Sequence, residues 1–342
     1  MFNWKWSLKE LDQVVNNKYK VFGTFLCAGG SSMGYKLAGY QHLGGVEIDP
    51  RAAELYSVNL KPKYLYVEDI REFNKRSELP KDLFDLDILD GSPPCSTFSV
   101  AGSRESAWDI KKKFREGQTS QRLDDLCFAY IETIEKLKPK IAILENVAGI
   151  VFGNAKFYSR AIVNKLKDIG YQTQIFMLNS ATMGVPQSRG RVFFICYRES
   201  LNLPKLELNF DEKPIFFGTV KTHAGKKLNP NTDAYKILLN AIPSDTHLKN
   251  VNLRVSKKGG RFGSMIISDS RVFPTLTSQG AHYLKHEMAK VCDADLISVS
   301  SFPHDYEFLK QRATYYLGMS VPPIMTAQIA KQIKLQWLDV LS

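Results

Sequence analysis

The chain has 342 residues, 44% of them hydrophobic, with a formal net charge of +11 and a pI near 9.2. This length allows one large domain, or a large domain with a small one. The positive charge favours a polyanionic partner, nucleic acid first, although a basic surface can also serve solubility alone. The five cysteines are odd in number and lack C-x-x-C spacing, which argues against a disulfide framework or a zinc site and indicates a reducing compartment. The sequence has no long apolar stretch and no basic-then-apolar leader, so we expect neither a membrane-spanning nor a secreted protein.

The first predicted strand, at residues 21–26, leads into a turn of small residues, Cys27-Ala28-Gly29-Gly30-Ser31-Ser32, and then into a helix from Met33. Strand, glycine turn and helix in this order open a nucleotide-type binding unit, because glycines let the backbone approach a ligand. Such turns are common, so the signal is weak alone. A second strand, within residues 44–50, ends in acids that could accept hydrogen bonds from ribose hydroxyls. The alternative role, capping a helix, suits Asp49 better than Glu47.

Further strands are predicted at residues 64–67, 84–89, 141–144, 172–178 and 192–197, with helices at 126–137 and 157–167. This alternation predicts an α/β fold with a doubly wound, Rossmann-like sheet. The pattern breaks after residue 199, and residues 200–275 are expected to form irregular segments. These make either a small second lobe with a basic face or a set of solvated loops. Regular structure returns near Phe273, and the last helix is predicted at 324–338. The basic residues of the lobe are Lys221, His223, Lys226, Lys227, Lys249, Arg254, Lys257, Lys258 and Arg261.

Cys95 lies in the stretch Gly-Ser-Pro-Pro-Cys-Ser-Thr-Phe-Ser, residues 91–99, directly after a predicted buried strand. Open α/β sheets keep ligands and chemistry at this edge of the sheet. Two prolines restrict the backbone before the cysteine. A thiol there is a candidate nucleophile once its proton is removed; the alternative is an inert cysteine in a rigid loop.

Three other stretches carry candidate functional residues. Glu145 ends the apolar strand 141–144, where such a residue is more often a cap or an ion-pair partner. Arg189 and Arg191 lie two apart in Gln-Ser-Arg-Gly-Arg before the strand at 192–197, a pattern that is most often a solvated pair of charges. The turns at 302–306 and 318–323 are aromatic and proline-rich, as in plain scaffold.

Together these stretches resemble the DNA cytosine-5 methyltransferase family of bacteria and phages, over residues 21–198 and about 272–338, with the motifs in the family's order. The resemblance implies an S-adenosylmethionine-dependent catalytic domain at 1–198 and 276–342, and a target recognition domain at 199–275. It implies no metal. Catalytic roles are implied for Cys95, Glu145, Arg189 and Arg191. Cofactor binding is implied for Phe25, Ala28, Gly29, Gly30, Glu47, Ile48, Asp69, Ile70, Pro94, Leu126, Ser320 and Val321.

The implied reaction transfers a methyl group to C5 of cytosine. The Cys95 thiolate adds to C6 and makes C5 nucleophilic, Glu145 holds or protonates N3, and Arg191 binds O2 with Arg189 in support. Because the base is stacked inside a duplex, it must be flipped into the pocket. The basic loop at 102–122 has the position to close over it, or to form a phosphate-contacting rim.

Two positions depart from the family pattern: Cys27 replaces the first glycine of the turn, and Met319 replaces the usual asparagine. These departures leave a catalytically idle DNA-binding regulator as one alternative, although Cys95, Glu145, Arg189 and Arg191 argue against it. A tRNA cytosine-5 methyltransferase is another, because one branch of the family acts on tRNA. We expect a monomer on double-stranded DNA, cytoplasmic and associated with the nucleoid. A companion restriction endonuclease, acting separately, and a solitary or phage-borne methylase are both left open.

Overall fold

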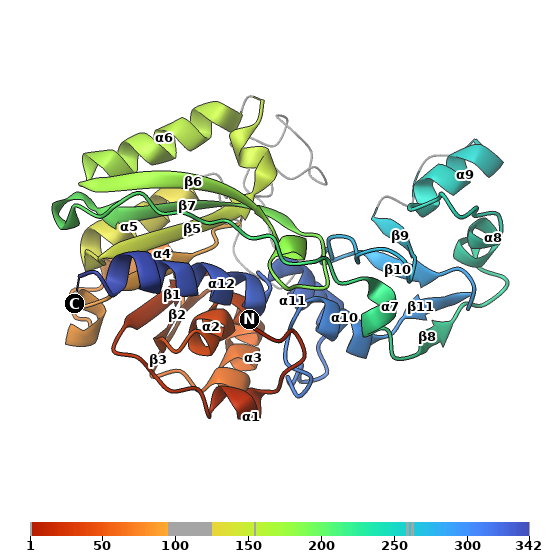
Figure 1. Ribbon diagram of the computed structural model, residues 1–342, viewed down its shortest axis with the longest axis horizontal. Coiled ribbons are helices and arrows are strands. Elements are labelled where there is room, and N and C mark those ends of the chain that lie inside the picture. The colour runs from red at the N-terminus through yellow and green to blue at the C-terminus, as the bar shows by residue number, and fades with distance from the viewer. Residues whose placement is uncertain (1, 95–124, 154, 258–259, 261–262, 342) are drawn as a thin grey trace. The chain divides into compact units, whose positions relative to one another are not determined.

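The computed structural model describes residues 2–94, 125–153, 155–257, 260 and 263–341 (Figure 1). The chain divides into two compact units, each assembled from three segments. The sheet unit comprises Leu11–Asn179, Gly190–Asn209 and Thr326–Ser342. The lobe unit comprises Met1–Glu10, Ser180–Arg189 and Phe210–Met325. Cys95 and the loop at 102–122 lie outside the described residues.

The sheet unit is built on a seven-stranded sheet in the order β3-β2-β1-β4-β5-β7-β6. The first five strands along the chain run parallel, and β7 is antiparallel to both β5 and β6. The predicted doubly wound α/β fold is therefore confirmed. The strands are β1 (Lys20–Thr24), β2 (Gln41–Glu47), β3 (Tyr64–Val67), β4 (Ile88–Gly91), β5 (Ile141–Val147), β6 (Tyr171–Asn179) and β7 (Gly190–Arg198).

One face of this sheet packs against α4 (Ile70–Lys75), α5 (Leu126–Leu137) and α6 (Ala155–Asp168). Phe22, Phe73, Ile134 and Phe194 belong to that apolar core. On the other face, α2 (Gly30–Leu37) sends the Tyr35 hydroxyl to Asp90, because successive strand residues point to opposite faces. The chain between α2 and β2 is tied to α12 (Pro323–Ile333) through the Tyr40 hydroxyl, which donates to the carbonyl of Ala330. The remaining helix after β2 is α3 (Pro50–Leu60).

Several predicted boundaries change. The strand predicted at 84–89 begins only at Ile88, because Lys81–Phe84 forms a 3₁₀ turn. Glu145 lies inside β5, which continues to Val147. The last helix, α12, continues into a π-helical turn at Lys334–Leu338, close to its predicted extent. Asp49 does cap α3, accepting a hydrogen bond from the Arg51 N–H.

The lobe unit contains a four-stranded sheet in the order β8-β11-β10-β9. The expectation of irregular segments at 200–275 is wrong, because the described residues of this range form three helices and two strands. Each has only four to nine residues, too short for a periodic pattern, and packing stabilises them: Leu238, Leu248, Val251 and Tyr283 share one buried cluster. The elements are α7 (Phe217–Val220), β8 (Ala224–Lys227), α8 (Asp233–Leu239), α9 (Leu248–Ser256), β9 (Ser264–Ile267), β10 (Ala281–Leu284), β11 (Ala289–Val291), α10 (Asp293–Val299) and α11 (Ala313–Met319), preceded by α1 (Leu8–Leu11).

Within the residues that the model describes, no helix has the length and apolar character to cross a membrane.

Candidate active site

A cavity with about 350 Å³ of empty space opens at the carboxyl ends of the parallel strands of the sheet unit. Six residues predicted from the sequence line it, and two further lining residues, Val46 and Glu68, were not predicted. Val46 directly precedes the predicted residue Glu47, and Glu68 directly precedes the predicted residue Asp69. The ends of β2 and β3 therefore contribute neighbouring residues to the cavity wall. The complete lining is Phe25, Val46, Ile48, Glu68, Asp69, Ile70, Pro94 and Leu126.

The turn after β1 has an unusual backbone that closes one side of this region. Phe25, Cys27 and Gly29 have φ values of 57°, 48° and 76°. The positive φ of Gly29 favours glycine, and a Cβ there would also lie 2.5 Å from Leu60 Cδ1, so that the leucine side chain would have to move. Cys27 adopts a left-handed conformation that glycine takes without strain, which explains why a glycine is usual at this position. Ala28 and Gly29 are buried within the turn, and Gly30 begins α2.

Glu47 is fixed as a hydrogen-bond acceptor between two cavity-lining residues, Val46 and Ile48. Its Oε2 accepts from the Cys27 N–H at 2.7 Å, and its Oε1 accepts from the Asp49 N–H at 2.8 Å. Burial raises the pKa of the Glu47 carboxyl, while these backbone hydrogen bonds act in the opposite direction. A carboxylate has about four lone-pair sites, so the Glu47 carboxylate keeps capacity for a ligand hydroxyl beside these backbone donors.

Glu145 and Arg191 meet on neighbouring strands. In the β5–β7 register Glu145 pairs with Phe193, so Arg191 lies two residues along and on the same face. Arg191 Nε lies 2.9 Å from Glu145 Oε1, and both side chains are largely buried. Burial lowers the pKa of the Arg191 guanidinium, and the neighbouring Glu145 carboxylate opposes this shift. Glu145 is thus an ion-pair partner, one of the alternatives for a strand-end glutamate, and Arg191 is buried rather than solvated. The catalytic roles of both residues stay predictions.

The segment that leads to Cys95 is tied to β5 beside this ion pair. Asn146 follows Glu145, and its Nδ2 donates to the carbonyl oxygen of Pro93 at 3.3 Å. Pro94, the residue directly before Cys95, lines the cavity. The structure therefore fastens the proline turn to the strand that carries Glu145, a link that sequence reasoning did not include.

Arg189 contacts a different part of the chain. The residue is 2% exposed, and its guanidinium donates to the carbonyl oxygens of Leu276 and Gly318, at 2.9 and 3.0 Å, all within the lobe unit. The backbone of Gly318 packs directly against the backbone of Ser278, because a Cβ at Gly318 would lie 2.3 Å from the Ser278 nitrogen. Arg189 therefore braces the chain just before Met319, Ser320 and Val321. The catalytic role of Arg189 and the cofactor roles of Ser320 and Val321 stay predictions.

Asp90 is a buried acid that the sequence analysis did not single out. It lies in β4 opposite Ile143 of β5, which places it on the same face as Glu145. The Tyr35 hydroxyl donates to its Oδ1 at 3.0 Å. Burial raises the pKa of Asp90 to about 7, opposed by the hydrogen bonds from Tyr35 and Ser31 and reinforced by the nearby Glu145. The sequence feature that could have identified Asp90 is its position as an acid at the end of an otherwise apolar strand.

The predicted basic face of the lobe is partly neutralised. Lys221 forms ion pairs with Asp269, at 3.1 Å, and with Glu287, and Arg254 pairs with Asp245 at 2.7 Å. His223, Lys226, Lys227 and Lys257 are exposed. Lys258 and Arg261 lie outside the described residues.

Comparison with known proteins gives a consistent family. A family model described as C-5 cytosine-specific DNA methylase matches residues 19–335. The Type II methyltransferase M.AplI of Arthrospira platensis is 25% identical over 334 residues, which cover 95% of this chain and 88% of that protein. The Type II methyltransferase M.Sau96I of Staphylococcus aureus is 35% identical over 188 residues, which cover 54% of this chain and 40% of that protein.

Among solved structures, a triple mutant of Spodoptera frugiperda DNMT2 superposes with a TM-score of 0.62 at 16% identity, covering 92% of this chain and 99% of that one. This likeness concerns the fold. The match of the family model over most of the chain goes further, because it shows the family. The chain belongs to the C-5 cytosine-specific DNA methylases, and is a DNA (cytosine-5-)-methyltransferase.

Proposed function

We propose that this chain methylates C5 of a flipped-out cytosine within a specific sequence of duplex DNA, through a covalent bond between Cys95 and C6. The observation that carries the proposal is the anchoring of the Pro93–Pro94 turn by Asn146, directly beside the buried Glu145–Arg191 pair. This arrangement supports a pocket in which the residue after Pro94 acts on the same ring that the ion pair holds.

The cavity of the sheet unit fits S-adenosylmethionine, which the family implies as methyl donor. Apolar walls from Phe25, Ile48 and Leu126 suit an adenine ring, and the fixed carboxylate of Glu47 suits ribose hydroxyls. The first N–H groups of α2, which begins at Gly30, suit the carboxylate of the amino-acid part. When bound, S-adenosylmethionine supplies an electrophilic methyl group.

The protein residues activate the cytosine. The Cys95 thiolate forms a bond to C6, and the electron pair of the C5–C6 double bond becomes available at C5. Glu145 holds a proton at N3, so that negative charge does not build up on the ring, and Arg191 donates hydrogen bonds to O2. After C5 has been methylated, loss of its proton and breakage of the S–C6 bond restore the aromatic ring and release the thiolate.

We propose duplex DNA as the partner, in which the target base must leave the stack to reach the pocket. We assign sequence recognition and phosphate contacts to residues 199–275, where exposed cations such as Lys226 and Lys257 remain available. The names of the curated relatives support a Type II restriction-modification setting with a separate endonuclease. We further propose that the enzyme acts as a monomer in the cytoplasm, at the nucleoid.

Bisulfite sequencing of DNA from cells that express the protein tests this proposal. We expect methylated cytosines within one recurring sequence, and none above background for Cys95→Ala. Cys292→Ala, which removes a half-buried thiol in the lobe unit, is the matched control and should methylate as the parent does. Full methylation by Cys95→Ala, or a purified parent protein that methylates tRNA but not duplex DNA, would contradict the proposal.

A further inference from the structure

We propose that Arg71 is a positioning residue for the methyl donor, which joins two walls of the cavity and aims the Asp69 carboxylate at the adenine amino group. This inference rests on the proposed function, because it takes S-adenosylmethionine as the occupant of the cavity. It adds a residue that neither lines the cavity nor belongs to a motif used in the sequence analysis.

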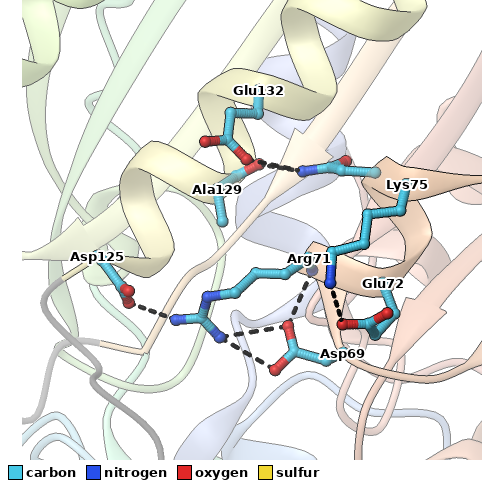
Figure 2. Close-up of polar contacts among 8 residues, drawn as sticks. Asp69, Arg71, Glu72, Lys75, Asp125, Ala129 and Glu132 are labelled. Atoms are coloured by element: carbon cyan, nitrogen blue, oxygen red, sulfur yellow. Dashed lines mark hydrogen bonds and ion pairs between the residues drawn. The ribbon is translucent and has the colours of Figure 1, made fainter.

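Arg71 binds two carboxylates at once, as Figure 2 shows. Its Nη1 lies 3.0 Å from Asp69 Oδ2 and 3.3 Å from Asp69 Oδ1, and its backbone N–H donates to Asp69 Oδ1 at 2.8 Å. Its Nη2 donates to Asp125 Oδ1. The guanidinium therefore holds Asp69 in a single orientation and balances two negative charges with its rigid, planar set of donors.

The two carboxylates belong to the starts of two helices that form the cavity wall. Asp69 caps α4, and both Asp69 and Ile70 line the cavity. Asp125 precedes α5, whose first residue, Leu126, also lines it. Arg71 is thus the tie between these two helix starts. Its side chain is 29% exposed, against 24% for Asp69 and 48% for Asp125, so the tie lies at the rim rather than in the core.

The consequence for the ligand follows from the geometry of Asp69. Its Oδ1 accepts the capping hydrogen bond from the Arg71 N–H. Its Oδ2 accepts the side-chain hydrogen bond from Arg71 Nη1. A carboxylate oxygen can accept more than one hydrogen bond, so Oδ2 keeps capacity for an amino group. Without the Arg71 guanidinium, the Asp69 carboxylate would keep the hydrogen bond from the backbone N–H of residue 71 but lose the side-chain hydrogen bonds that fix its second oxygen.

Helix α4 also supplies a control. Lys75 pairs with Glu72 at 2.7 Å, as Figure 2 shows, and both side chains are more than half exposed. Neither residue lines the cavity. Lys75→Met therefore removes an ion pair from the same helix without affecting the cavity wall, whereas Arg71→Met removes the tie itself.

The test measures binding of two ligands by calorimetry: S-adenosylhomocysteine and its deaminated counterpart S-inosylhomocysteine, which lacks the adenine amino group. We expect the parent to prefer the adenosyl ligand by at least tenfold. Arg71→Met should weaken binding of the adenosyl ligand about tenfold and leave the inosyl ligand nearly unchanged, so that the preference disappears. Arg71→Lys should retain part of it, Asp125→Asn should reduce it a few-fold, and Lys75→Met should bind as the parent does.

In steady-state assays Arg71→Met, Arg71→Lys and Asp125→Asn should show a raised KM for S-adenosylmethionine with kcat within twofold of the parent, and Lys75→Met should keep the parent's KM. The inference is overturned if Arg71→Met keeps the parent's preference for the adenosyl ligand over the inosyl ligand. This holds whether both ligands bind as tightly as to the parent or both bind more weakly by the same factor. A parent that binds neither ligand would instead contradict the proposed function, and a parent that binds both alike would contradict the role of Asp69. Arg71→Met should melt within a few degrees of the parent, because the residue is partly exposed.

Discussion

At the scale of single residues, Asp90 shows how the sheet face beside Glu145 accommodates a second acid. Its carboxyl group is enclosed between β4 and α2, where Tyr35 and Ser31 donate to it, and it lies on the same face as Glu145. Two ionised carboxylates on this face would repel each other. Burial and the charge of Glu145 therefore favour a protonated Asp90 in the folded protein.

This raised pKa predicts a pH-dependent stability. An unfolded aspartate ionises near pH 4, whereas Asp90 in the folded protein keeps its proton until about pH 7. Between these values the folded state binds more protons than the unfolded state, so stability falls as pH rises from about 4 to 7, by roughly 4 kcal/mol at most. Asp90→Asn, which cannot ionise, should lose this component. Urea unfolding of both proteins at pH 5 and pH 8 measures it, and equal pH slopes would show that Asp90 is ionised in the fold.

At the scale of elements, the close packing of β2 against β3 depends on a glycine. Gly44 has a φ of 122°, and a Cβ there would lie 1.8 Å from the carbonyl oxygen of Tyr64, its partner in β3. Backbone atoms of a paired strand cannot move aside as a flexible side chain can. Gly44 therefore permits the parallel pairing that holds the β3 end, and with it Glu68 and Asp69, beside the cavity.

Gly44→Ala should destabilise the protein by more than about 3 kcal/mol, because the steric overlap adds to backbone strain. Gly170→Ala is the matched control: its φ is 84°, but no atom lies within 4 Å of the added Cβ. It should cost only the strain, about 1–2 kcal/mol. Chemical denaturation of both variants makes the comparison. Similar losses for the two would mean that β3 can shift to accept a side chain.

The elements also show what sequence patterns can predict. Apolar runs located the strands β5, β6 and β7 to within a few residues, because buried strands need such runs wherever they pair. The antiparallel insertion of β7 between β5 and β6 was not predicted, since pairing depends on contacts far apart in the sequence. The lobe helices, such as α8 and α9, are too short to show a period and are stabilised by packing.

The residues of the candidate site likewise divide into those that the sequence predicted and those that it did not. Residues in motifs at strand ends, such as Phe25, Asp69 and Pro94, were predicted and do line one cavity. Asp90, Asn146 and Arg71 were not singled out, because each acts through a partner that only the fold brings near: Tyr35, Pro93 and Asp125. Sequence spacing alone also treated Arg189 and Arg191 as one pair, whereas they belong to different compact units.

At the scale of the whole molecule, each compact unit depends on segments from distant parts of the chain. In the lobe unit, Trp6 Nε1 donates to the carbonyl of Ser301. In the sheet unit, Trp337 Nε1 donates to the carbonyl of Pro204 at 2.8 Å. The division by function, with catalysis at 1–198 and 276–342 and target recognition at 199–275, stays a prediction that runs across these compact units.

The central claim is that the Cys95 sulfur bonds to C6 of the target cytosine. DNA in which 5-fluorocytosine replaces cytosine tests it directly, because fluorine at C5 cannot leave as the proton does and the covalent complex persists after methyl transfer. With S-adenosylmethionine present, we predict a protein–DNA complex that survives denaturing electrophoresis, with the modified base attached to the peptide containing Cys95. A preparation that methylates ordinary DNA yet yields no such complex, or one attached at another residue, would contradict the account.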